Sequence, residues 1–178
     1  MQYENLQERY TNLAGCAEWI VGDSEKVLPT FQFADMVFTC PPYYNLERYT
    51  NHPDDLSMQP NYDAFLQKYT SILYKASRCL KDNSFFVIVV SEVREECRGI
   101  EKSNFVGLVP DTIHILRDEC SLHYYNEIIV LNNIGSLPIR APKYFDQSRK
   151  IGRMHQNCLV FYKGDLKAIE EKFGTLQE

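Results

Sequence analysis

The sequence predicts an α/β fold with a mostly parallel sheet that ends in an antiparallel hairpin. Two apolar runs, 35–39 and 85–90, are continuous rather than alternating, which is typical of strands buried on both faces of a parallel sheet. Between them, a sustained apolar stripe predicts a helix over 61–81. Two further strands, predicted over 122–132 and 157–162, follow each other without a helix between them, and that order favours an antiparallel pair.

The chain before the first of these strands is predicted to hold three short elements. Apolar residues three and four positions apart predict a helix over 3–13. The apolar run 18–22 predicts a strand. Asp23 and Ser24 are suited to begin a helical turn, which Pro29 closes.

The remaining segments are two irregular regions and two helices. The polar stretch 44–60 is long for a loop in a compact domain, which is typical of a functional or mobile segment. A proline and an aspartate at its start favour a helix over 110–118. The segment 133–154 is predicted to be irregular, and a short helix over 165–173 with Asp165 as its cap closes the chain.

The composition is typical of a globular protein. A chain of 178 residues with 44% hydrophobic and 24% charged residues is expected to form one globular domain. The net charge of -5 argues against a general nucleic-acid coat, because phosphate neutralisation drives non-specific binding, but it allows a local basic face. No apolar run is long enough to span a membrane.

The cysteines indicate a reducing compartment and no metal site. The six are scattered without a C-x-x-C pair, and none has zinc-ligand spacing. We therefore expect reduced thiols in a cytoplasmic protein and no bound metal.

The most informative motif is Cys40-Pro41-Pro42-Tyr43, directly after the predicted strand 35–39. Neither proline can donate to a strand ladder, so the chain must leave the sheet there in a stiff, extended conformation. That point is the carboxyl end of a strand, where open α/β sheets bind ligands. A rigid turn that binds nothing is the alternative interpretation.

This motif resembles motif IV of the amino-methyltransferases that modify exocyclic amines in DNA, whose pattern is Asp, Asn or Ser, then Pro-Pro, then an aromatic residue. The flanks extend the resemblance: the apolar run 19–24 ends in Gly-Asp-Ser, and Arg149-Lys150 followed by 155–164 is similar to the closing strand of phage and prophage methylases. The resemblance covers residues 19 to 164. It implies a Rossmann-like class I methyltransferase fold that uses S-adenosylmethionine and acts on DNA.

The resemblance also implies roles for the motif. The side chain of Cys40 and the carbonyl of Pro41 would accept hydrogen bonds from the target amine, with Pro42 holding the turn, although sulfur is a weak acceptor. The ring of Tyr43 would stack on a base flipped out of the helix.

The cofactor and the nucleic acid would contact other positions. Asp23, Ser24 and Cys40 would hold S-adenosylmethionine, with a helix N-cap as the alternative for Asp23. Basic residues interleaved with aromatics suit a nucleic acid, with a solvated loop as the alternative. The residues expected to contact the nucleic acid are Tyr44, Arg140, Lys143, Arg149, Lys150 and Arg153.

One part of the family pattern is absent. No Gly-x-Gly occurs in the sequence, and too few residues precede 19–24 for two strands with their crossover helices. We therefore expect residues 1–178 to form one partial methyltransferase domain without its first βαβ unit. A second subunit that carries the glycine loop, or a homodimer mate, would complete it.

Two functions stay open from the sequence. The first is methylation of adenine N6 or cytosine N4 in DNA, with autonomous activity doubtful because the glycine loop is absent. The second is an inactive methyltransferase-like module that binds nucleic acid or a protein. The motif does not choose between adenine and cytosine or between DNA and RNA.

Overall fold

The computed structural model describes residues 17–31, 33–94, 104–133, 135, 141–142, 145–146 and 149–174. The predicted helix 3–13 lies outside the described residues, as do Arg140 and Lys143. None of the described helices combines the length and the apolar character needed to cross a bilayer.

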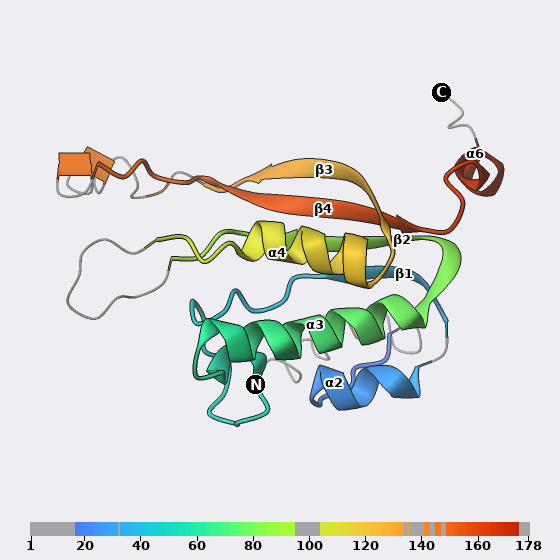
Figure 1. Cartoon of the computed structure of the whole chain (residues 1–178), viewed down its shortest axis with the longest axis horizontal. Helices are drawn as coiled ribbons and strands as arrows, with labels where there is room; N and C mark the ends of the chain where they lie inside the picture. Colours follow the sequence, from blue (N-terminus) through green and yellow to red (C-terminus); the bar gives the residue numbers. More distant parts are fainter. Residues whose placement is uncertain are drawn as a thin grey trace.

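Four described strands form one mixed sheet, in the order β1-β2-β4-β3 (Figure 1). They are β1 (Ala34–Thr39), β2 (Leu80–Val90), β3 (His123–Leu131) and β4 (His155–Lys163). β1 and β2 are parallel, whereas β2 with β4 and β3 with β4 are antiparallel. The antiparallel pairing of the last two predicted strands is confirmed. The expectation of a mostly parallel sheet was wrong for the described strands, because β4 also lies antiparallel beside the central strand β2.

The described helices agree with the sequence in place, with shifted ends and two exceptions. The helices are α2 (Ser24–Val27), η2 (Leu28–Thr30), η3 (Leu56–Met58), α3 (Tyr62–Cys79), α4 (Leu108–His114), the π-helical turn η4 (Ile115–Glu119) and α6 (Ala168–Phe173). The exceptions are that η3 lies in the predicted loop and that the N-cap of α6 is Lys167 and not the predicted Asp165. The long helix α3 begins at Asn61, whose side chain accepts a hydrogen bond from the backbone N–H of Ala64 at 2.8 Å. At its other end, the ammonium of Lys163 donates to the carbonyl of Ser77 in the last turn of α3 and to that of Leu80, the first residue of β2.

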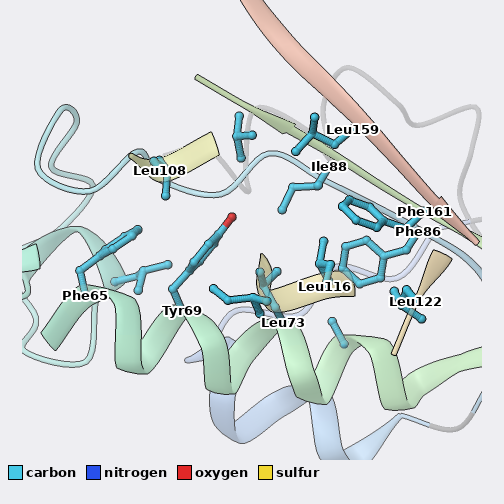
Figure 2. Close-up of a cluster of buried hydrophobic side chains, with 14 of the residues drawn as sticks. Phe65, Tyr69, Leu73, Phe86, Ile88, Leu108, Leu116, Leu122, Leu159 and Phe161 are labelled. Atoms are coloured by element: carbon cyan, nitrogen blue, oxygen red, sulfur yellow. The ribbon is translucent and has the colours of Figure 1, made fainter. Parts of the chain in front are cut away.

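The hydrophobic core lies between α3 and one face of the sheet. Phe65, Tyr69 and Leu73 of α3 point toward Phe86 and Ile88 of β2, with side chains from α4, η4 and β4 between and beside them (Figure 2). Each such side chain contributes about 1.5–3 kcal/mol when fully buried. The buried hydroxyl of Tyr69 forms a hydrogen bond with the hydroxyl of Thr112 at 3.0 Å, so its burial does not leave an unpaired polar group in the core.

The opposite face of β1 is open, which corrects the expectation of a strand buried on both faces. Val37 packs against the core, but Met36 and Phe38 point the other way and are 52% and 65% exposed. At another place on that face, Phe173 of α6 packs on Phe85 of β2, with ring centroids 5.2 Å apart. β1 is also an edge strand.

The predicted strand 18–22 was wrong. Residues 17–21 have no regular secondary structure, and the side chains of Trp19, Ile20 and Val21 are exposed. An apolar run becomes a strand only where a neighbour hydrogen-bonds to it, and no described strand lies beside this one. The predicted helical turn forms as α2, but Pro29 does not close it, because the chain continues as η2 with Pro29 inside it.

Candidate functional site

The Pro-Pro motif lies where β1 leaves the sheet. Pairing of β1 with β2 ends at Thr39, opposite Ile88, because the following prolines have no N–H to donate. The hydroxyl of Tyr43 reaches the next residue of β2 instead, 3.3 Å from the carbonyl oxygen of Val89. The motif is therefore tied to the sheet at the carboxyl end of β1, as the sequence predicted.

The hydroxyl of Tyr43 has three neighbours. Besides the Val89 carbonyl, it lies 3.3 Å from Oε1 of Gln156 in β4 and 3.3 Å from Sγ of Cys40. A phenol has one proton, so it donates to the carbonyl oxygens of Val89 and Gln156 in alternation and can accept from the thiol. Burial, together with the hydrogen bond to Cys40, raises the pKa of Tyr43, so its hydroxyl stays protonated at neutral pH.

The ring of Tyr43 is half-buried and packs against the rim of the core. A ring that is supported by the core on one side and reaches solvent on the other can act as a stacking platform for a base. The geometry of Tyr43 is compatible with the role that the sequence assigned to it.

Tyr44 does not share that position, and its burial argues against the predicted contact with a nucleic acid. Its backbone is in the left-handed region, with φ 54°, and its side chain points into the core with 7% exposure. Its ring meets Tyr62 and Phe65 of α3 edge to face, with centroids 5.4 and 5.5 Å away. A side chain enclosed in this way cannot reach a DNA strand.

Asp23 acts as a helix cap and an ion-pair partner. One carboxylate oxygen accepts from the N–H of Glu25 at 3.1 Å, and the other lies 3.2 Å from the ammonium of Lys68 on α3. The side chain of Asp23 is only 9% exposed. The capping interpretation is thus confirmed, and Ser24 is the exposed first residue of α2.

The loop after the motif is held by internal hydrogen bonds. The carboxylate of Asp55 accepts from the backbone N–H and the hydroxyl of Thr50 and from the same two groups of Ser57, at 2.7 to 2.9 Å. Burial alone would raise the pKa of Asp55, but these four donors outweigh it and hold the pKa below its usual value. Lys68 also donates to the carbonyl of Asp54, which joins the loop to α3.

The described basic residues differ in their surroundings. Arg149 is exposed, lies over the ring of Phe145 and is 3.8 Å from the carboxylate of Asp146. Lys150 is half-buried. Arg153 donates from its guanidinium to the side-chain oxygen of Asn157 and to the backbone of β4, so at least part of its role is structural.

The structure brings the motif and the basic segment together through β4. Tyr43 contacts Gln156, and Arg153 contacts the next residue, Asn157, whose amide in turn donates to Glu127 of β3. Side chains of consecutive strand residues point to opposite faces, so the two contacts lie on either side of the same strand end. No role for Gln156 or Asn157 follows from the motifs of the sequence. The sequence signal that could have pointed to them is a pair of polar residues near the start of an otherwise apolar strand.

No protein-family model matches the chain, and no curated protein matches it in sequence. Solved structures do match in fold. A putative DNA modification methylase of Thermus thermophilus, complexed with S-adenosyl-L-methionine, is 22% identical with a TM-score of 0.57, over 89% of this chain and 56% of that one. The cytosine-N4-specific PvuII DNA methyltransferase is 16% identical with a TM-score of 0.55, over 87% of this chain and 54% of that one.

This chain therefore spans about half the length of the methyltransferases that it matches. Identities this low show likeness in fold alone. The chain has an α/β fold similar to that of class I DNA methyltransferases.

Proposed function

We propose that this chain is one part of a DNA amino-methyltransferase that methylates an exocyclic amine of adenine or cytosine with S-adenosylmethionine. The observation that carries the proposal is that the Pro-Pro motif and the basic segment contact consecutive residues, Gln156 and Asn157, at the same end of β4. An enzyme that acts on a base outside the duplex needs a stacking surface and phosphate contacts at the same end of its sheet. The likeness in fold to DNA methyltransferases supports the same assignment.

The motif would prepare the target amine. The lone pair of an exocyclic amine is delocalised into the ring, which makes the nitrogen a poor nucleophile. An acceptor for the amine hydrogens makes the nitrogen more tetrahedral and aims its lone pair. The carbonyl of Pro41 is the stronger acceptor for this purpose, because the thiol of Cys40 accepts weakly. Stacking on Tyr43 would hold the base in the plane that this contact requires.

The described residues fit only part of S-adenosylmethionine, which supplies the methyl group when bound. The carboxylate of Asp23 is already engaged by Glu25 and Lys68, and the sequence contains no Gly-x-Gly. We propose that a second subunit supplies the rest of the cofactor site beside the edge strand β1. Asp23, Ser24 and Cys40 would complete the site from this chain.

DNA binding tests the base-binding role of Tyr43. Replacing Tyr43 with alanine should weaken binding to duplexes that carry one mismatched base by ~1–3 kcal/mol, which is typical of one stacking contact. Tyr49→Ala is the matched control, because Tyr49 is exposed in the same loop and its hydroxyl contacts only the neighbouring Glu47 among the hydrogen bonds described. Thermal unfolding of both variants separates lost binding from lost folding. Unchanged affinity together with a lowered unfolding temperature would assign Tyr43 to the core and overturn the proposal.

Titration with S-adenosylmethionine tests the need for a further subunit. We expect weak or no binding by this chain alone and no methyl transfer to unmethylated DNA, because a sulfonium and an amino-acid tail need several placed partners to offset lost solvation. Micromolar binding with turnover would show that this chain completes the site by itself.

The second candidate function is a methyltransferase-like module that binds without catalysis. The cysteine in place of an oxygen-bearing residue at the start of the motif favours it. DNA binding that depends on Tyr43, without methyl transfer in any complex that binds S-adenosylmethionine, would support this candidate.

A further inference from the structure

The contact between Tyr43 and Gln156 joins segments that are 113 residues apart. β4 does not lie beside β1, since β2 separates them in the sheet. The Tyr43 hydroxyl thus lies near the end of β2, within hydrogen-bond distance of both the Val89 carbonyl in β2 and the Gln156 side chain in β4, the next strand. One hydroxyl ties the Pro-Pro motif to two strand ends.

The two acceptors, the Val89 carbonyl and the Gln156 side chain, restrict the Tyr43 ring in different ways. The carbonyl of Val89 belongs to the backbone of a central strand and is held by the sheet. A single acceptor lets the phenol rotate about one hydrogen bond, whereas two acceptors that share one phenol proton keep the hydroxyl within the range of directions that faces both, which restricts the ring plane. Oε1 of Gln156 is that second acceptor. Gln156 is itself half-buried and pairs with Val130 of β3, so its backbone is fixed.

We propose that Gln156 is a positioning residue that sets the plane of the Tyr43 ring for base stacking. The inference rests on the proposed function, because it assumes that Tyr43 stacks on a base. The uncharged amide accepts the phenol proton over the whole pH range in which the protein is folded. It therefore holds the ring without placing a charge beside DNA phosphates.

The position of Gln156 separates this role from that of the basic segment. Asn157, which holds Arg153, points to the other face of β4. Changing Gln156 should accordingly alter stacking without releasing Arg153. The salt dependence of DNA binding, which reports phosphate contacts, should stay the same in a Gln156 variant.

The first measurement follows the Tyr43 ring directly. In protein labelled with ¹³C in its tyrosine rings, the Tyr43 signal is the one that disappears in Tyr43→Phe. This signal should shift in Gln156→Leu, which keeps the volume but removes the acceptor, and should return toward its original position in Gln156→Glu, which restores an acceptor. Gln67→Leu is the matched control, because Gln67 is exposed on α3. A Tyr43 signal that does not respond to Gln156→Leu overturns the inference.

The second measurement is the ratio of affinities for DNA with a mismatched base and the same DNA with an abasic site at that position. Gln156→Leu should reduce this ratio by about 2- to 12-fold, the range of one neutral hydrogen bond. Tyr43→Phe, which also removes the hydrogen bond to the Val89 carbonyl, should reduce the ratio at least as much, and the double variant should lose no more than Tyr43→Phe alone. Additive losses would mean that Gln156 acts elsewhere and would overturn the inference.

The outcomes distinguish the inference from the proposed function. If the wild-type chain binds both DNAs equally, the proposed function fails, and the positioning role fails with it even where the Tyr43 signal shifts. If the wild type discriminates and Gln156→Leu shifts the signal without changing the ratio, only the positioning role fails. A shifted signal, a reduced ratio and recovery of both in Gln156→Glu support the inference.

Discussion

The carboxylate of Asp23 lies 3.2 Å from the ammonium of Lys68, and both side chains are largely buried. The pair joins α2 to the middle of α3, and the same carboxylate caps α2. Asp23 therefore has a structural role before any cofactor arrives. This relationship matters for the site because the same ammonium donates to Asp54 in the loop that follows the Pro-Pro motif.

Two substitutions of Asp23 should destabilise the fold by different amounts. Asp23→Asn keeps a side-chain acceptor for the cap but removes the charge that faces Lys68, whereas Asp23→Ala removes both. We expect Asp23→Ala to lower the free energy of unfolding by about 1 kcal/mol more than Asp23→Asn, the usual contribution of an N-cap. Urea unfolding of the three proteins measures this difference. Equal stability of the two variants would show that the cap contributes nothing.

Acid should loosen the loop that Asp55 holds. The pKa of Asp55 is below its usual value in the folded protein, so its carboxylate stabilises the fold above the unfolded pKa of about 3.9. This stabilisation is lost as pH falls through the lower, folded pKa. The free energy of unfolding of Asp55→Ala should therefore depend less on pH below about 5 than that of the wild type. Glu171→Ala, a change at an exposed carboxylate on α6, is the control and should leave the pH dependence as it is.

The open face of β1 should tolerate polar substitution. Phe38 is 65% exposed, whereas Phe86 on the core face of the neighbouring strand is fully buried. Phe38→Lys should change the free energy of unfolding by about 0.5 kcal/mol or less, while Phe86→Ala should lower it by about 3–5 kcal/mol. Phe38→Lys should also reduce self-association in sedimentation experiments, because it places a charge on an exposed apolar edge. A large loss of stability in Phe38→Lys would mean that this side chain is covered.

The basic segment 149–153 should set the salt dependence of DNA binding. Replacing Arg149 and Lys150 with alanine should reduce the slope of log affinity against log salt by about 1.8, the value for two phosphate contacts. Arg78→Ala combined with Lys167→Ala changes the net charge equally and is the control. Arg78 is in the last turn of α3, just before β2 begins, and Lys167 follows the end of β4, whereas the 149–153 segment precedes the start of β4. Equal slopes in the two double variants would show that Arg149 and Lys150 do not contact phosphates.

Several elements could be predicted because their causes are local. The apolar stripe of α3 repeats every three to four residues, and Asn61 is a strong cap, so the helix forms where the sequence places it. The two prolines remove the N–H groups that a strand needs, which ends β1 at Thr39. The capping role of Asp23 depends on the two residues after it, and it too was accessible from the sequence.

The tertiary structure decided what depends on distant neighbours. Tyr43 and Tyr44 are adjacent and chemically identical, yet one reaches Gln156 and the other lies in the core against α3. The apolar runs at 18–22 and in β1 have the same local character, but the first has no described strand beside it and the second is exposed on one face. Pattern and spacing determine which way a backbone can fold locally. Burial and hydrogen-bond partners depend on segments far along the chain, so only the packed structure decides which of two equivalent side chains becomes part of a site.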